Sequence, residues 1–208
     1  MHLSLFLFII NLQICASEPF NLIEGFISLP LDQSNPVIQR PYDVPEDQRY
    51  NFIDGVHKLW VYSTDKPHSP ISKTSPRTEI RIHGYDYSSD SSSGVWQFEG
   101  YGYVPNGTYG VCIMQVFGAS SQATTLALTV NNGSLSYYGG PVLVPNIYDR
   151  WFLLNVIHDV DASDVKVYID GVLKYEAAGH GEKTHYFKCG VYAQRNDSYY
   201  ITMAKVLN

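Results

Sequence analysis

The sequence predicts an all-β protein, a β-sandwich or β-jelly roll built from two antiparallel sheets. Three observations lead to this prediction. Short segments rich in β-branched and aromatic residues recur along the chain, separated by turn residues. Two pairs, Asn132-Gly133 and Asp170-Gly171, stand between such segments, where type I′ hairpin turns favour Asn or Asp followed by Gly. No stretch shows the long apolar period of 3.6 residues that marks a helix, so we expect little helix.

The chain begins with a predicted secretory signal, residues 1–17. An apolar run over residues 3–10 leads to small residues that suit cleavage before Glu18. The alternative is a membrane anchor, but this run is shorter than the ~20 residues that a spanning helix needs. We therefore expect no membrane attachment once the signal is removed.

Residues 18–49 are expected to form an extended arm. Four prolines lie from Pro30 to Pro45 with few periodic apolar positions, so the arm would run over the surface and could cover a sheet edge. One domain, residues 50–208, follows, because 208 residues are enough for a single sizeable core. Its strand candidates are 57–62, 77–83, 95–104, 110–117, 125–130, 135–138, 151–160, 165–169, 172–176, 186–194 and 199–206.

Three glycosylation sequons support export, at Asn106, Asn132 and Asn196. Without the signal, two cysteines remain, Cys112 and Cys189. We expect both on the core faces of their strands. In an oxidising compartment they could form a disulfide, which we favour, or remain two buried free thiols.

The chain carries a formal net charge of −6, which argues against a nucleic acid partner, since phosphate recognition needs a basic surface. Its charged strand segments are more specific. Side chains alternate between the faces of a strand, so Arg77, Glu79 and Arg81 would share one face. A local positive site for an anion is therefore expected against an acidic background, and charges beyond about 8–10 Å are screened at physiological salt.

A second segment, residues 186–194, repeats this arrangement. Tyr186, Lys188, Tyr192 and Gln194 would lie on one face, and Phe187, Cys189, Val191 and Ala193 on a core-like face. A third segment, Ile113-Met114-Gln115-Val116-Phe117, completes the set. Two or more such strands side by side would line one groove.

These three segments together resemble the signature of the alginate-lyase-type polysaccharide lyases. That signature has an Arg-Ser/Thr-Glu-Leu/Val-Arg strand, a Gln-Ile/Val-His strand and a Tyr-Phe-Lys-Ala-Gly-Val-Tyr-Asn-Gln strand. Phe117 stands where the lyases carry their histidine. From about residue 20 to 207 the chain is still more similar to the plant citrate-binding proteins, a secreted or vacuolar branch with the same fold, through residues 94–103 and 144–152. The resemblance implies a concanavalin-like jelly roll with a concave groove.

The resemblance also implies roles for individual residues. Lyases of this type cleave uronate polymers by β-elimination, in which Arg77 and Gln115 would neutralise the substrate carboxyl group. Arg81 and Lys188 would hold neighbouring anionic groups, and Tyr192 would transfer protons. The residue chemistry agrees in part: arginine grips a carboxylate through two hydrogen bonds. A tyrosine with a pKa near 10 needs nearby cations to act as a base.

Five further residues are predicted to belong to the groove. Phe117 cannot move a proton, so its presence weakens the enzyme hypothesis and narrows the groove. His83 continues the face of Arg81 and is a candidate replacement, although a histidine at a strand end in contact with water is the simpler interpretation. Glu79 would orient the two arginines. Tyr186 and Gln194 complete the ligand-binding set, while most other tyrosines suit strand and core packing.

Three functions follow as hypotheses. The first is a secreted or vacuolar binding protein, monomeric, that holds citrate or an acidic sugar in a lyase-type groove. The second is a β-eliminating lyase on uronate polymers with Tyr192 as base and acid. The third is a proton-transfer enzyme for a small plant metabolite, using Tyr192 and Lys188. We expect no cofactor and no metal, because the histidines lack zinc spacing and there is no glycine-rich phosphate loop.

Overall fold

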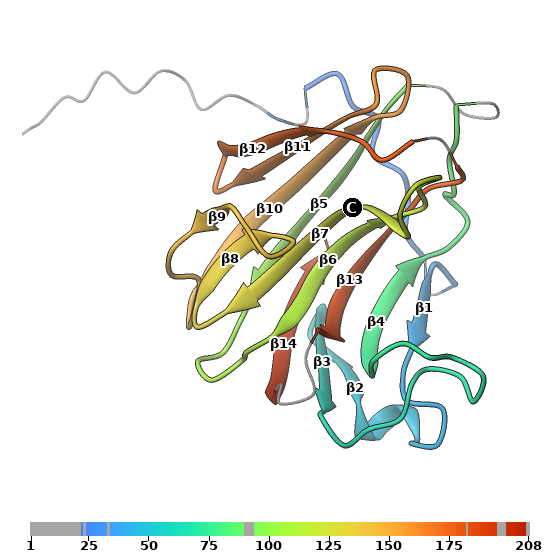
Figure 1. The fold of residues 1–208 in the computed structure, drawn as a ribbon, viewed down its shortest axis with the longest axis vertical. Helices are drawn as coiled ribbons and strands as arrows, with labels where there is room; N and C mark the ends of the chain where they lie inside the picture. The colour runs from blue at the N-terminus through green and yellow to red at the C-terminus, as the bar shows by residue number, and fades with distance from the viewer. Residues whose placement is uncertain are drawn as a thin grey trace, which may run out of the picture.

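The protein is an all-β sandwich of two seven-stranded sheets in a computed structural model (Figure 1). The structure describes residues 22, 24–32, 34–89, 94–181, 183–194 and 199–206, the last of these as backbone only. The predicted signal and the sequon at Asn196 lie outside the described residues. Every pairing between named strands is antiparallel, as predicted. No helix in the described part of the chain is long and apolar enough to cross a membrane.

The first sheet carries the candidate site. Its order from edge to edge is β1 (Pro36–Gln39), β4 (Arg77–Ile82), β13 (Tyr186–Ala193), β6 (Val111–Phe117), β7 (Thr124–Asn131), β8 (Ser134–Tyr137) and β9 (Val142–Val144). All three charged segments of the sequence therefore form adjacent strands, β4, β13 and β6.

The second sheet packs against the first. Its order is β12 (Val172–Ala178), β11 (Asp164–Ile169), β10 (Trp151–Asp159), β5 (Val95–Tyr103), β14 (Tyr199–Val206), β3 (Val56–Tyr62) and β2 (Tyr50–Ile53). In both sheets a strand from the end of the chain lies between strands from its first part: β13 separates β4 from β6, and β14 separates β3 from β5.

The hydrophobic core fills the space between the sheets. Ile80, Val116 and Leu128 of the first sheet are buried in one cluster with Leu59 and Val156 of the second. Burial of each such side chain stabilises the fold by about 1.5–3 kcal/mol. The alternation that puts Ile80 in this core puts Glu79 and Arg81 on the opposite face of the sheet.

The tight turns predicted from Asn132-Gly133 and Asp170-Gly171 are present. Both residues of each pair have positive φ, 48° and 79° in the first and 52° and 77° in the second. A third turn of this kind, at Asp54-Gly55, has φ of 53° and 76° and joins β2 to β3. Its Asp-Gly pair was visible in the sequence, but the short strand β2 before it was not predicted.

The N-terminal arm is only partly extended. Its residues 36–39 form β1, which pairs with β4 and so covers that edge of the first sheet. A 3₁₀ turn, η1 (Glu46–Gln48), follows. The sequence did not predict this strand, because the prolines of the arm argue against regular pairing. Pro36 stands at the first position of β1, where a missing N–H is tolerated on an edge strand. The short strand β9 was also missed.

Candidate functional site

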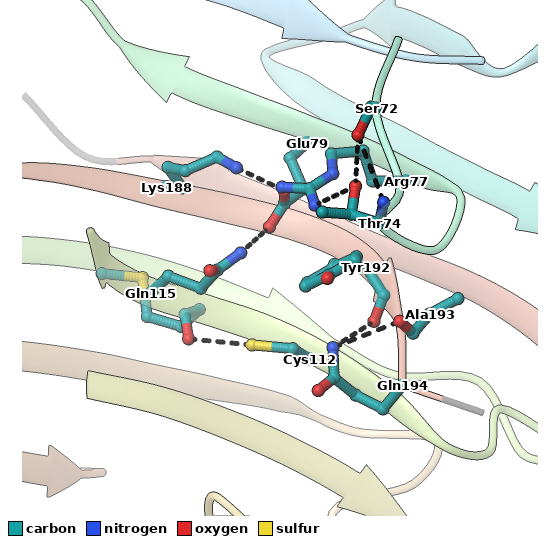
Figure 2. A network of polar contacts seen from close by, with 11 residues as sticks. Ser72, Thr74, Arg77, Glu79, Cys112, Gln115, Lys188, Tyr192, Ala193 and Gln194 are labelled. Carbon is teal, nitrogen blue, oxygen red and sulfur yellow. Dashed lines mark hydrogen bonds and ion pairs between the residues drawn. The ribbon is translucent and has the colours of Figure 1, made fainter. Parts of the chain in front are cut away.

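The candidate site lies on the face of the first sheet that is turned away from the core (Figure 2). Its centre is Glu79 on β4, which is completely buried. Lys188 Nζ donates to Glu79 Oε2 at 2.5 Å, and Arg77 Nη1 donates to the same oxygen at 3.1 Å. Gln115 Nε2 donates to the other oxygen, Oε1. We call these four residues the Glu79 cluster.

Strand register explains why these residues meet. Lys188 lies opposite Gln115 on one side of β13 and opposite Arg81 on the other. Tyr192 lies opposite Arg77. Cross-strand partners share a face, so the regular alternation of β4 and β13 brings the predicted groove residues together.

Gly190 makes this pairing of β4 with β13 possible. It has a φ of +142°, and a Cβ placed on it would lie 2.5 Å from the backbone oxygen of Thr78. Any side chain at this position would therefore push β13 away from β4. Because Gly190 stands opposite Glu79, such a displacement would open the cluster at its centre.

The Glu79 cluster is unusual for its burial. Arg77 and Lys188 are 6% and 1% exposed and Gln115 is 3% exposed. Burial lowers the pKa of Lys188, and the Glu79 carboxylate opposes that shift. Removing charges from water costs more than most ion pairs regain, so a buried cluster of this kind is weak evidence for stability and better evidence for a functional site.

Two tyrosines lie over the two arginines. The Arg77 guanidinium carbon is 3.8 Å from the ring centroid of Tyr192, and that of Arg81 is 4.0 Å from the ring centroid of Tyr186. Phe117 stacks on Tyr186 with 5.0 Å between ring centroids. The pKa of Tyr186 is raised by burial, against the opposing effect of Arg81. These rings form an aromatic rim around the cationic groups.

Arg81 is the most accessible cation of the site. Its side chain is 27% exposed, and its Nη2 contacts Asp86 Oδ2 at 2.5 Å. The Nε atoms of Arg81 and Arg77 are both buried without a hydrogen-bond partner in the described part of the chain. Arg77 is held more completely, because its Nη2 also donates to Thr74 Oγ1 at 3.0 Å. An incoming anion would therefore meet Arg81 first.

Two predicted site residues lie away from the cluster. His83 follows the end of β4 and is exposed. Its backbone N–H donates to the carbonyl oxygen of Asn35, and its own carbonyl oxygen accepts from Asn35 Nδ2. Gln194 follows the end of β13 and is also exposed, with its Nε2 donating to the carbonyl oxygens of Tyr192 and Ala193 at 3.3 Å (Figure 2). Neither side chain reaches Glu79 through a contact that the structure shows.

The predicted disulfide is wrong. Cys112 and Cys189 are both buried free cysteines, and burial raises the pKa of each thiol to about 12. The register of β6 shifts between Cys112 and Met114, so simple alternation fails there. Cys112 lies opposite Tyr192 on the site face and donates to the carbonyl of Met114, whereas Cys189 packs in the core. The two thiols are on opposite faces of the sheet.

Sequence reasoning missed His68, in the connection between β3 and β4. Burial lowers its pKa first, and the positive charges of Arg77 and Lys188 lower it further. Its Nδ1 is buried without a partner among the described residues. No strand register applies to this connection, so no pattern in the sequence marks His68 as a neighbour of the cluster. No group of three or more His, Cys, Asp or Glu side chains in the described ranges could hold a metal ion.

Comparison with known proteins identifies the family. A family model described as alginate lyase matches residues 27–207, and the chain belongs to this family. A citrate-binding protein from Hevea brasiliensis is 47% identical over 191 residues, which cover 92% of this chain and 77% of that protein. The predicted likeness to both groups is thus confirmed.

Solved structures show the same fold at low sequence identity. The alginate lyase AlgAT5 of polysaccharide lyase family 7 superposes with a TM-score of 0.62 at 16% identity, covering 83% of this chain and 91% of that one. An alginate lyase from Pseudomonas aeruginosa superposes with a TM-score of 0.60 at 15% identity, covering 86% and 100%. The predicted jelly-roll sandwich is therefore confirmed.

Proposed function

We propose that the chain binds a small polycarboxylate or an acidic sugar at the aromatic rim of the Glu79 cluster. The observation that carries this proposal is Phe117. It stacks on Tyr186 inside the site, at the position where the resembling lyases have a histidine, and it has no group that moves protons. The cations of the site are retained. The Hevea relative, named for citrate binding, supports the same proposal.

Arg81 makes the first contact with the ligand in this proposal. Its guanidinium offers a planar fork for a carboxylate, and its present partner Asp86 is 33% exposed, so an anion can compete with it. Arg77 and Lys188 act mainly through their charge, because both are buried against Glu79. Together with Arg81 they give three cations against the two carboxylates of Glu79 and Asp86.

Titration calorimetry with citrate tests this proposal through Arg81→Ala. Arg77→Ala is a poorer test, because it would also leave a buried carboxylate with one cation fewer. We expect Arg81→Ala to weaken citrate binding tenfold or more, since a charge-assisted bidentate contact is worth about 1.5–3 kcal/mol.

The matched control is Arg150→Ala, which removes an arginine with a 40% exposed side chain that pairs with Asp170 at 2.8 Å, just before β10 and away from the Glu79 cluster. We expect this variant to bind citrate as the unmodified chain does, and binding by both to weaken as salt is added. Equal affinity of the Arg81→Ala variant and the unmodified chain would overturn the proposal.

A β-eliminating lyase is the second candidate, supported by Tyr192. Its half-buried ring lies against Arg77, so a proton-transfer group remains next to a cation. The test is absorbance of unsaturated product from a panel of uronate polymers, with Tyr192→Phe as the control variant. A signal that the variant loses would establish the lyase, and a flat trace on every polymer would remove this candidate.

We further propose that the chain passes through the secretory pathway to the cell wall or vacuole as a glycosylated monomer. The exposed positions of Asn106 and Asn132 in turns support glycosylation. Digestion with an N-glycosidase should lower the mass of the protein purified from its source. An unchanged mass would argue against modification at these sites.

A further inference from the structure

Three aromatic residues lie on the outer face of the second sheet, where β5 and β10 run side by side (Figure 1). Tyr103 of β5 stands opposite Trp151 of β10, and their ring centroids are 5.5 Å apart. Phe152 packs in the core, so alternation puts Trp151 on the face turned away from it. Trp151 is 44% exposed, and Tyr101 on the same face is 39% exposed. We call Tyr101, Tyr103 and Trp151 the outer aromatic patch.

The sequon at Asn106 follows directly after this patch along the chain. Its turn is closed by the backbone N–H of Thr108, which donates to the carbonyl oxygen of Pro105 at 3.2 Å. Gly107 has a φ of +87°, as the third residue of a type II turn requires. Asn106 is exposed, and a Cβ placed on Gly107 would meet no atom of the described residues within 4 Å. The turn therefore leaves space for a sugar on the Asn106 side chain.

One carboxylate oxygen connects the sequon to the patch. Asp149 Oδ1 accepts from the backbone N–H of Asn106 at 2.9 Å and lies 3.4 Å from the hydroxyl oxygen of Tyr103. The backbone N–H of Asp149 donates in turn to the carbonyl oxygen of Val104 at 2.9 Å, and Trp151 is only two residues further along. A glycan on Asn106 would therefore begin beside the Tyr103 hydroxyl, next to the pair of rings.

Sugar rings have the chemistry that such a patch can bind. One face of a pyranose ring presents C–H groups and its rim presents hydroxyls, so the face can pack on an aromatic ring while the hydroxyls stay in water. Covering apolar surface in this way is favourable by roughly 25 cal/mol per Å² removed from water. Aromatic rings supply a large and rigid apolar area for the contact.

We propose that the outer aromatic patch binds the first sugar residues of an N-linked glycan on Asn106, which pack over Trp151. This inference rests on the glycosylation proposed above and gives the glycan a fixed place on the protein. The glycan covers the exposed indole, and the patch in return holds the glycan against the second sheet.

The second described sequon, at Asn132, provides a matched control. The ring beside its Gly133 is that of Tyr148, which is half-buried and whose hydroxyl donates to the carbonyl oxygen of Thr108. A glycan at Asn132 therefore starts beside a ring that is already packed, and its removal by Asn132→Gln should leave Trp151 as accessible as before.

Acrylamide quenching of tryptophan fluorescence tests the proposal on the chain secreted from plant cells. The protein has three tryptophans, and Trp60 and Trp96 are half-buried, so Trp151 dominates the accessible signal. We expect Asn106→Gln to raise the quenching constant, and this rise to vanish when Trp151 is also changed to Phe. The same variants made in bacteria, without glycans, should be quenched alike with and without Asn106→Gln.

Mass spectrometry of the secreted chain separates the two levels of the proposal. An unmodified Asn106 would overturn both the glycosylation proposed at this site and the inference built on it. A glycan that is present but leaves the quenching constant equal in the unsubstituted chain and Asn106→Gln would overturn this inference alone. A rise as large in Asn132→Gln, or in the bacterial protein, would also overturn it, because the cover would then not come from the Asn106 glycan.

Thermal unfolding of the secreted variants gives a second, independent measure. We expect loss of the glycan through Asn106→Gln to lower the midpoint by about 2–4 °C, the shift usual for one favourable aromatic contact in a domain of this size. In the Trp151→Ala background the same change should have little effect, since the glycan has lost its contact. Equal shifts in both backgrounds would contradict the proposal.

Discussion

Two groups of ionisable side chains are buried in this sandwich, and they differ in how the free-energy cost of that burial is reduced. On one face of the first sheet, the Glu79 cluster keeps its charges and pairs them, with Lys188 and Arg77 on one carboxylate oxygen. Between the sheets, Tyr87, His158 and His185 pack together, with Tyr87 Oη and His158 Nδ1 3.1 Å apart. We call these three residues the histidine pair and its tyrosine. These three residues include no carboxylate that could pair with a charged imidazole.

The difference lies in how burial acts on each group. Burial lowers the pKa of His158 to about 4 and also lowers that of His185, so both imidazoles are neutral near pH 7. The Glu79 cluster cannot neutralise itself so simply, because the arginine stays protonated. A neutral buried group serves packing at little cost, whereas a charged one is expensive to bury and suits a binding site.

The largest effect is expected from Glu79→Gln. This change keeps the shape of the side chain but leaves Lys188 and Arg77 buried without a carboxylate. We expect a loss of about 3–5 kcal/mol in the free energy of unfolding, measured by urea denaturation. Glu176→Gln, at a carboxylate that is 51% exposed, is the control and should change little. A midpoint unchanged by Glu79→Gln would show that the cluster is not held together by charge.

The histidine pair predicts a pH dependence. The pKa of His158 is near 6.5 in the unfolded chain and about 4 in the folded one, so the unfolded state binds more protons between these values. The stabilisation is therefore complete above pH 6.5 and lost as the pH falls towards 4, by about 3 kcal/mol for His158 alone. His185 shifts in the same direction, and the nearby carboxylates of Asp159 and Asp164 reduce the effect on His158.

Urea titrations at a series of pH values measure this dependence. His158→Gln should flatten it, while the exposed His83, changed to Gln, should leave it as it is. A profile that stays equally steep in the His158→Gln variant would mean that other groups cause the acid sensitivity.

A smaller effect is expected from Tyr87→Phe. The ring still stacks on Trp96, with 4.6 Å between centroids, but the hydroxyl partner of His158 is lost. We expect a cost of about 1 kcal/mol, the usual value of a hydrogen bond between neutral groups. Tyr42→Phe, at a tyrosine that is 45% exposed, is the control. Equal denaturation midpoints for both variants would show that the hydroxyl contributes nothing.

The smallest effect on stability is expected from Arg81→Ala. Its ion pair with Asp86 is partly exposed and screened by solvent, so the free energy of unfolding should fall by less than about 1 kcal/mol. The same variant should bind citrate at least tenfold more weakly, which separates function from stability at this position. A loss as large as that of Glu79→Gln would instead make Arg81 a structural part of the cluster.

The sequence predicted the site well where the strands are regular. Alternation along β4 and β13 correctly put Arg77, Glu79, Lys188 and Tyr192 on one face, because strict period two leaves no other choice. The number of sheets, the two tight turns and most strands followed from the same patterns. Strands β1, β2 and β9 were missed, because each has only three or four residues and β1 also begins with a proline.

The errors fall where local geometry departs from the ideal. The irregular register after Cys112 reversed its face, which no residue type announced, and so the disulfide prediction failed. His83 was placed by extending the alternation beyond the end of β4, where the chain leaves the sheet. His68 lies in a connection, where the charges of Arg77 and Lys188 lower its pKa, and its place there depends on tertiary packing alone.

The order of strands in the sheets has a consequence for how the protein is made. Strands β4 and β6 cannot pair with each other, because β13 must lie between them, and β14 must likewise enter between β3 and β5. On the ribosome, most of the sandwich therefore emerges before either sheet can be completed. Strand edges that β13 and β14 cover in the folded protein then stay unpaired until late in synthesis, and in that interval they are open to pairing with other chains.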